Sequence, residues 1–325
     1  MIPFDKDNFI PCAIQSKLTQ FDELATALYI HQSTNNPVLQ KFIKSTSTPE
    51  ASMRFLPVEF FKTHEVITGT VKPGLIFTSS TTSGGIPSRH YVANKSIYER
   101  SYLECFRLFY GEPADYVFLC LLPSYLERTG SSLIDMAQGL ITASGNADSG
   151  FYLYDFEKLN ASIHRVQQSG KRIFLLGVTF ALLDFAETFH GNLAHAVVME
   201  TGGMKGRKEE QTRDEVHRFL RSEFKVDHIH SEYGMTELLS QAYAKQNGRF
   251  SCPPWMKILI TDLQDPFCMM PPGKAGLINV IDLANMDSCA FIQTSDIGRL
   301  HPDGSFEVLG RMDHSEIRGC NLMYQ

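Results

Sequence analysis

The sequence lacks the features that mark several large classes of protein. Its cysteines number seven among 325 residues, and no two are spaced as CxxC, which argues against a disulfide framework or a zinc site. No apolar run approaches the ~18 residues of a membrane-spanning helix. The opening MIPFDKDNFIP has no basic segment followed by an apolar run, so no signal peptide is expected. These absences predict a reduced, cytoplasmic protein without a membrane span.

An excess of positive charge is also missing. Lys and Arg together number 30 against 36 Asp and Glu, which gives a net charge of −6 and predicts no general attraction to nucleic acid. Hydrophobic residues make up 43% of the chain and charged residues 20%, which is typical of a globular protein with a core. The length allows two domains, or one large α/β domain with an appendage.

Strand and helix patterns alternate from about residue 75, after a first part that reads as short helices and loops. Strands are predicted over 74–80, 115–123, 172–178, 194–200 and 226–230. Helices are predicted over 94–110, 131–143, 155–168, 179–189 and 208–224. This alternation favours a mostly parallel sheet covered by helices on both faces.

The pattern changes after residue 250. The segments KILITD, GLINVID, CAFIQT and SFEVLG read as short strands separated by Gly, Pro and Asp turns. We therefore expect an α/β core over 1–250, which includes the helical N-terminal segment, and a β-rich, mainly antiparallel lobe over 251–325.

A loop rich in hydroxyl groups and glycine follows the strand predicted at 74–80. It reads FTSSTTSGGIPSRH over 77–90. Backbone N–H groups and hydroxyls in such a loop can cradle phosphate oxygens, and Arg89 adds a positive charge. An ordinary surface loop is the simpler interpretation of this segment alone, and it is not a Walker A loop.

Two further segments end or follow predicted strands. METGGMKGRK (199–208) places two glycines where open α/β sheets bind ligands. HSEYGMTE (230–237) offers an aromatic ring, a hydroxyl and, at Glu237, a hard oxygen ligand for Mg²⁺. Each alone could be a glycine turn or a solvated carboxylate. His228 and His230 alternate along the predicted strand, which favours a structural role over metal binding.

The β-rich part holds two more polar segments, TSDIGRL (294–300) and VLGRMDHSEIRGC (308–320). Asp296 and Arg311 are their candidate functional residues, although each alone could be a surface charge. The order of all five segments is more informative than any one of them.

In that order the segments resemble the adenylate-forming superfamily. Within it the chain most resembles the acyl-protein synthetases of bacterial bioluminescence, and phenylacetate–CoA ligases look like more distant relatives. The supporting segments are LPVEFFKTHEV (56–66), LLGVTFALLDF (175–185), ETGGMKGR (200–207) and SEIRGCNL (315–322). The resemblance covers nearly the whole chain. It implies an α/β fold of mostly parallel layered sheets flanked by helices, with a small β-rich C-terminal lobe.

The resemblance also implies roles for individual residues, with ATP and Mg²⁺ as cofactors. The triphosphate loop would comprise Ser79, Ser80, Thr81, Thr82, Ser83, Gly84 and Gly85. Gly202 and Gly203 would lie beside the adenine, and Tyr233 would stack on it. Thr236 would approach the α-phosphate, and Glu237 would bind the magnesium ion.

The ribose would be held from the β-rich part. Asp296 resembles the carboxylate that accepts hydrogen bonds from both ribose hydroxyl groups. Arg311 resembles the ribose or phosphate contact just before the hinge aspartate, here Asp313. Because the sequence ends soon after Asp313, we expect the mobile C-terminal domain and its catalytic lysine to be missing, as they are in acyl-protein synthetases.

The phosphate loop departs from the superfamily pattern S-G-T-T-G-x-P-K. Ser80 replaces a glycine, Ser83 is an apparent insertion, and Ser88 with Arg89 stands in place of the lysine. We take Arg89 as a candidate catalytic residue for this reason.

The function implied is ATP-dependent activation of a carboxylic acid, a fatty acid in the first place, followed by acyl transfer to a thiol. Cys320 is the candidate acyl acceptor within the chain. The alternatives are transfer to CoA, a carrier-protein thiol or a partner such as a reductase, and a degenerate protein that binds nucleotide without catalysis. Segment 121–141 and the apolar residues of 179–189 are candidates for lining an acyl pocket, or equally for core.

Overall fold

The structure is a computed structural model that describes residues 20–46, 53–80, 85–123, 130–202 and 212–312. The N-terminal part is helical, as predicted, with α2 (Phe21–Asn35), α3 (Pro37–Ser45) and α4 (Phe60–Thr63). Asn36 separates the first two helices and caps α3, because its side chain accepts hydrogen bonds from the N–H groups of Val38 and Leu39.

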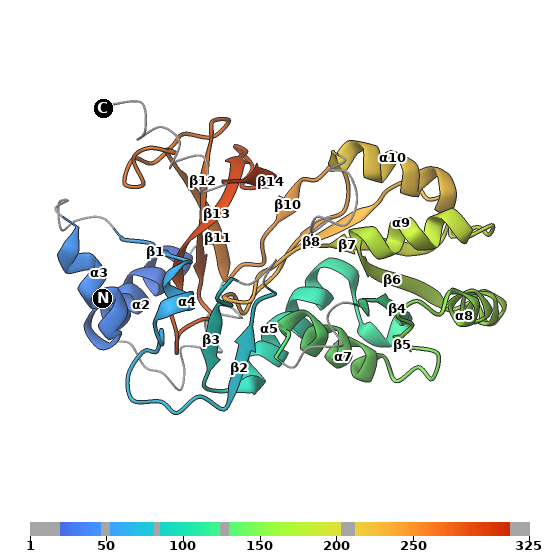
Figure 1. Ribbon diagram of the computed structural model, residues 1–325, viewed down its shortest axis with the longest axis horizontal. Coiled ribbons are helices and arrows are strands. Elements are labelled where there is room, and N and C mark those ends of the chain that lie inside the picture. Colours follow the sequence, from blue (N-terminus) through green and yellow to red (C-terminus); the bar gives the residue numbers. More distant parts are fainter. Residues whose placement is uncertain (1–19, 47–52, 81–84, 124–129, 203–211, 313–325) are drawn as a thin grey trace.

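Five parallel strands form one half of a large sheet. In spatial order they are β5 (Gly150–Phe151), β4 (Tyr116–Leu121), β6 (Arg172–Val178), β7 (Val197–Thr201) and β8 (His230–Tyr233). The helices that connect and cover them are α5 (Lys95–Tyr110), α7 (Ser132–Ser144), α8 (Phe156–Ser169), α9 (Thr179–Thr188) and α10 (Arg213–Phe224), with a short 3₁₀ turn η2 (Pro113–Asp115) before β4. Figure 1 shows α5 and α7 on one face of these strands and α9 and α10 on the other. All of β4 and all of β6 except its first residue are buried, which explains their unbroken apolar sequences and confirms the predicted parallel sheet.

The sheet continues with antiparallel strands beyond β8. In spatial order they are β9 (Ala242–Ala244), β10 (Phe250–Ser251), β14 (Phe306–Arg311), β13 (Phe291–Leu300), β12 (Ala275–Asp282) and β11 (Met256–Thr261), with β1 (Leu56–Pro57) parallel beside β13. The predicted antiparallel character after residue 250 is confirmed. β10 pairs with β9 on one side and β14 on the other, so the sheet passes through the expected boundary, and the division into two domains stays a prediction.

A small separate sheet carries the loop rich in hydroxyl groups. β2 (Leu75–Thr78) pairs antiparallel with β3 (Arg89–Val92), which the sequence did not predict. The strand predicted over 226–230 is wrong in position: β8 starts at His230, where its register with Met199 of β7 begins, and His228 lies outside it.

Helix ends follow local capping signals. Asn94 caps α5, and Gly170 ends α8 with a φ of 71°, both as predicted. α10 starts at Arg213 instead of residue 208, because Thr212 and Glu215 form a capping box in which each side chain bonds the other's backbone. Residues 208–211 of the predicted helix lie outside the described residues.

Candidate active site

The two ends of the hydroxyl-rich loop are joined to each other. The N–H of Ser79 donates to the carbonyl of Ser88 at 3.1 Å, and the N–H of Ser88 donates to Oγ of Ser79 at 2.9 Å. Ser80 and Gly85 are exposed beside this junction, and Arg89 is exposed at the start of β3. The predicted phosphate contacts at residues 81–84 lie outside the described residues.

Glu237 reaches this junction from the turn that follows β8. Its side chain is only 4% exposed, and the Ser88 hydroxyl lies close enough to its carboxylate to favour the charged form. Burial raises the pKa of Glu237, while Ser88 and the charges of Arg311 and Lys62 oppose that rise. Within the described residues no ion pair of Glu237 with Lys, Arg or His lies within 4.0 Å. A cation beside this carboxylate would favour its charged form over the neutral form that burial favours.

The donor set fits magnesium held mainly by a substrate. Within the part of the chain that the structure describes, no group of three His, Cys, Asp or Glu side chains could hold a metal ion. Magnesium commonly uses one or two protein carboxylates together with substrate phosphates and water. A single buried carboxylate beside a loop of hydroxyl groups meets that requirement.

Two residues that sequence reasoning missed hold the Thr236–Glu237 turn. Nδ1 of His90 lies 2.8 Å from the carbonyl oxygen of Thr236, and its Nε2 lies 3.0 Å from Oδ1 of Asn285. Asn285 in turn donates from Nδ2 to the carbonyl of Glu237 at 2.7 Å. Burial lowers the pKa of His90 to about 4, so the ring is neutral near pH 7. The only sequence signal for His90 was its place at the end of the 77–90 segment.

Tyr233, Asp296 and Arg311 also come together, from three strands. The Tyr233 hydroxyl donates to Oδ2 of Asp296 at 2.9 Å, and Nε of Arg311 lies 3.7 Å from Oδ1 of the same carboxylate. Asp296 and Arg311 face each other in the register of β13 and β14. Burial raises the pKa of Asp296, while Arg311 and the Tyr233 hydroxyl oppose that rise. The Tyr233 ring packs edge-on against Phe250 and Phe306 and is 9% exposed.

The end of β7 contributes a glycine and a buried acid. Gly202 has a φ of 65°, and its carbonyl accepts a hydrogen bond of 2.7 Å from Oγ1 of Thr179; Gly203 lies outside the described residues. Burial would raise the pKa of Glu200, but the neighbouring His217 and Ser231 side chains and the charge of Arg213 lower it. Its Oε1 lies 3.6 Å from Nε2 of His217.

A second acid, Glu232, lies on the neighbouring strand. Thr201 and Glu232 face each other in the register of β7 and β8, and the Thr201 hydroxyl bonds the carboxylate. Burial raises the pKa of Glu232 to about 7. Sequence reasoning missed both acids, although each stands two residues before the glycine that follows its strand.

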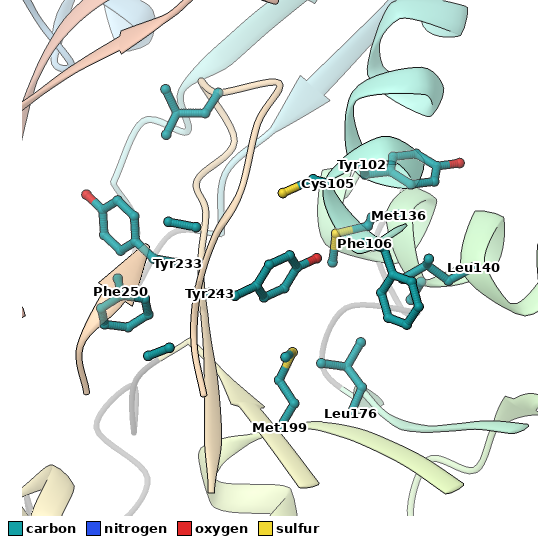
Figure 2. Close-up of a cluster of buried hydrophobic side chains, with 14 of the residues drawn as sticks. Tyr102, Cys105, Phe106, Met136, Leu140, Leu176, Met199, Tyr233, Tyr243 and Phe250 are labelled. Carbon is teal, nitrogen blue, oxygen red and sulfur yellow. The ribbon is translucent and has the colours of Figure 1, made fainter. Parts of the chain in front are cut away.

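The segments expected to line an acyl pocket contribute to the core. Phe180, Leu183 and Phe185 of α9 are buried. Figure 2 shows Met136 and Leu140 of α7 packed with Phe106, Leu176 and Met199, on the far side of the β8–β9 strands from Tyr233. An acyl pocket in this region stays a prediction.

The solved structures that resemble this one include enzymes bound to ATP and a ligase bound to an acyl adenylate. The chain matches MatB from Rhodopseudomonas palustris with ATP bound at a TM-score of 0.55 and 18% identity, over 73% of this chain and 47% of MatB. It matches a 2-hydroxyisobutyryl-CoA ligase bound to 2-HIB-AMP and CoA at a TM-score of 0.63 and 10% identity, over 94% of this chain and 72% of that one. The chain therefore has the fold of the adenylate-forming ligases, as the sequence predicted.

The family within that class is also defined. The model of the acyl-protein synthetase family LuxE matches residues 143–325, more than half of the chain, so the protein belongs to that family. The long-chain-fatty-acid–luciferin-component ligase of Vibrio harveyi is 25% identical in an alignment of length 186 that covers 52% of this chain and 48% of the relative. The chain thus spans about half the length of the curated relative it matches. No helix among the described residues is long and apolar enough to cross a membrane.

Proposed function

We propose that this protein uses ATP to activate a carboxylic acid, a fatty acid in the first place, as an acyl adenylate and then transfers the acyl group to a protein thiol. The observation that carries the proposal is the meeting of Glu237 with Ser88 at the end of the hydroxyl-rich loop, in a chain of the acyl-protein synthetase family. The name of the Vibrio harveyi relative supports a long-chain fatty acid as substrate. Five free cysteines among the described residues support the reducing environment of a cytoplasm.

The first half-reaction joins the acid to AMP. A carboxylate oxygen attacks the α-phosphorus of ATP, and the bond from that phosphorus to the bridging oxygen of pyrophosphate breaks. The loop from Ser79 to Gly85 and Arg89 would hold the phosphates, and the Thr236 hydroxyl would contact the α-phosphate. Positioning and charge neutralisation supply most of the rate in such transfers. Magnesium, when bound at Glu237, would neutralise phosphate charge.

The nucleoside would lie between β7 and β14. Gly202 and Gly203 would border the adenine, with Tyr233 against the base. Asp296 would accept hydrogen bonds from the ribose hydroxyls while Arg311, its partner across the strands, balances its charge. The position of Asp296 between Tyr233 and Arg311 supports this role, because the carboxylate is fixed before nucleotide arrives.

The second half-reaction uses a thiolate. Its sulfur attacks the carbonyl carbon of the adenylate, the bond to the AMP oxygen breaks, and a thioester remains. We propose Cys320, which lies outside the described residues, as the acyl acceptor. The proposal rests on the resemblance of SEIRGCNL to the family's C-terminal segment.

Exchange of labelled pyrophosphate into ATP, measured over acids of increasing chain length, tests the first half-reaction. Exchange that depends on one class of acid is expected. Lack of exchange with every acid would contradict the proposed activity and favour a protein that only binds nucleotide.

Intact-mass measurement after incubation with ATP, Mg²⁺ and the active acid tests the acceptor. We expect an acyl adduct that hydroxylamine removes and that Cys320→Ser abolishes while exchange continues. Cys268→Ser is the matched control, because Cys268 is a free and exposed cysteine among the described residues. An adduct that survives in Cys320→Ser would assign the acyl group to another thiol, and lack of any adduct would favour CoA or a carrier protein.

A further inference from the structure

The turn that carries Thr236 and Glu237, with the residues just after it, is bonded to the end of β12 and to the residues that follow that strand. Oδ2 of Asp282 accepts hydrogen bonds from the N–H groups of Leu239 at 2.7 Å and Ser240 at 3.0 Å. Asn285 adds the bond from its Nδ2 to the carbonyl of Glu237. Asp282 and Asn285 are almost completely buried, so water cannot replace these bonds without a local opening.

His90 bonds the same turn from the opposite direction. It is fully buried on β3, two residues after Ser88, and its ring packs edge-on against Phe61 with 5.8 Å between the ring centres. Its neutral ring has one N–H, while the Thr236 carbonyl and Oδ1 of Asn285 are both acceptors. The contact from Nδ1 to Thr236 is the shorter of the two, and we place the proton on that nitrogen.

The residues around Asn285 are held in turn by the N-terminal helix α2. Nε2 of Gln32 donates to the carbonyls of Asn285 at 3.0 Å and Met286 at 2.9 Å, and its Oε1 accepts from the N–H of Ala290 at 2.9 Å. Asn36 donates to the carbonyl of Ser288 at 2.9 Å. A continuous set of buried hydrogen bonds thus joins α2, the segment after β12, the Thr236–Glu237 turn and β3.

We infer that His90 and Asn285 are positioning residues of the proposed adenylation site, which fix Thr236 and Glu237 through the carbonyl groups of their own backbone. This inference rests on the proposed function. Neither side chain would contact ATP. Both would set where the Thr236 hydroxyl and the Glu237 carboxylate stand relative to the phosphate loop, because β3 carries that loop's end as well as His90.

Three substitutions of His90 separate a hydrogen bond from simple packing. In His90→Asn the amide nitrogen can occupy the place of Nδ1 and still donate to Thr236. In His90→Gln it occupies the place of Nε2, away from the Thr236 carbonyl, and His90→Phe keeps a ring against Phe61 without a bond to Thr236. We expect the rate of pyrophosphate exchange at saturating ATP to fall about 10²-fold in His90→Gln and His90→Phe, with a smaller change in the KM for ATP. His90→Asn should retain most of the rate.

Hydrogen exchange of the nucleotide-free protein gives a measurement that does not depend on activity. The amides of Leu239 and Ser240 should exchange faster in His90→Gln and His90→Phe than in wild type or His90→Asn. His230→Gln is the matched control: burial also lowers the pKa of that histidine, but its ring contacts Tyr110 and not the turn.

Equal loss in all three His90 variants would contradict the inference and reduce His90 to a packing residue. Wild-type rates in all three would also contradict it. If the wild-type protein shows no pyrophosphate exchange with any acid, the proposed function fails. The amide hydrogen exchange of Leu239 and Ser240 then decides alone whether His90 holds the turn.

Discussion

The phenol hydroxyl of Tyr233 donates a hydrogen bond of 2.9 Å to the carboxylate of Asp296, 63 residues further along the chain. The bond ties the aromatic residue expected beside the adenine to the acid expected at the ribose. Two parts of the proposed nucleotide site are therefore held in one arrangement by the protein itself.

Removal of that hydroxyl should destabilise the fold. Tyr233→Phe keeps the ring against Phe250 and Phe306 but leaves a buried carboxylate short of one donor, so the free energy of unfolding should fall by about 1–3 kcal/mol. Urea denaturation measures the change. Tyr91→Phe is the control, because its hydroxyl bonds the exposed Glu65 at 3.3 Å and water can take its place. Equal, small losses in both variants would contradict the importance of the Tyr233 bond.

Asp296 should govern nucleotide affinity. Asp296→Ala removes an acceptor for two ribose hydroxyls, and hydrogen bonds to charged groups contribute about 1.5–3 kcal/mol each, so ATP affinity should fall at least ~10-fold in calorimetry. Asp303→Ala, which removes an exposed acid from the β13–β14 turn, should leave affinity unchanged. Wild-type ATP binding by Asp296→Ala would refute the ribose assignment.

Glu237→Gln should separate activity from stability. Pyrophosphate exchange should drop by at least ~10²-fold, the scale of removing one preorganised electrostatic group. Because burial raises the pKa of Glu237, its charged form is a cost to the fold near pH 7, and the variant should be at least as stable as wild type. Exchange assays and urea denaturation on the same preparation check both outcomes. Unchanged exchange would remove Glu237 from the proposed metal site.

Glu232 should make stability depend on pH. Its folded pKa of about 7 lies above the unfolded value of 4.5. At low pH Glu232 is protonated in both states and does not affect stability, whereas above pH ~7 the folded state bears the full free-energy cost of the buried charge. Glu232→Gln should therefore raise the free energy of unfolding by up to ~3 kcal/mol near pH 8 and change it little near pH 4. Denaturation across this range measures the difference. Glu157→Gln, at an exposed position, is the control, and its free energy of unfolding should not gain on that of wild type as the pH rises. A difference between Glu232→Gln and wild type that does not change with pH would contradict the raised pKa of Glu232.

A close contact between α5 and α7 should make Gly139 irreplaceable. A methyl group there would lie 1.8 Å from the hydroxyl oxygen of Tyr102, which is 2% exposed and cannot easily move. Overpacking costs about 1–3 kcal/mol, more than the ~1 kcal/mol that alanine gains in a helix. Thermal unfolding should show Gly139→Ala destabilised and Gly150→Ala, with open space around it, near wild type. Equal stability of the two would mean that Tyr102 adapts.

The sequence allowed prediction of those strands and helix ends whose pattern lies within a few neighbouring residues. The strand at 172–178 has its predicted bounds, because a buried parallel strand is a continuous apolar run. Asn94 and Gly170 were identified as caps for similar reasons. The motifs also singled out Glu237 and Asp296, since their segments carry residue types at set spacings, and their functional roles stay predictions.

Contacts between distant segments could not be predicted in the same way. β3 exists because the loop after β2 turns back on itself, and RHYV alone has no strong strand pattern. His90 and Asn285 are 195 residues apart, so no spacing connects them. The strand at 226–230 was misplaced because Val226 and Ile229, both buried, are three residues apart and not at the two-residue period of a strand.

The bonds of Gln32 also have a consequence for synthesis on the ribosome. Its partners lie 253 to 258 residues further along the chain. At ~5–20 residues per second, α2 emerges tens of seconds before they are made. During that time the buried face of α2, which includes Phe21, Leu24 and Leu28, can pack only against early segments such as α3. The nascent chain therefore carries an incompletely covered helix for most of translation, which a chaperone that binds apolar helix faces could engage.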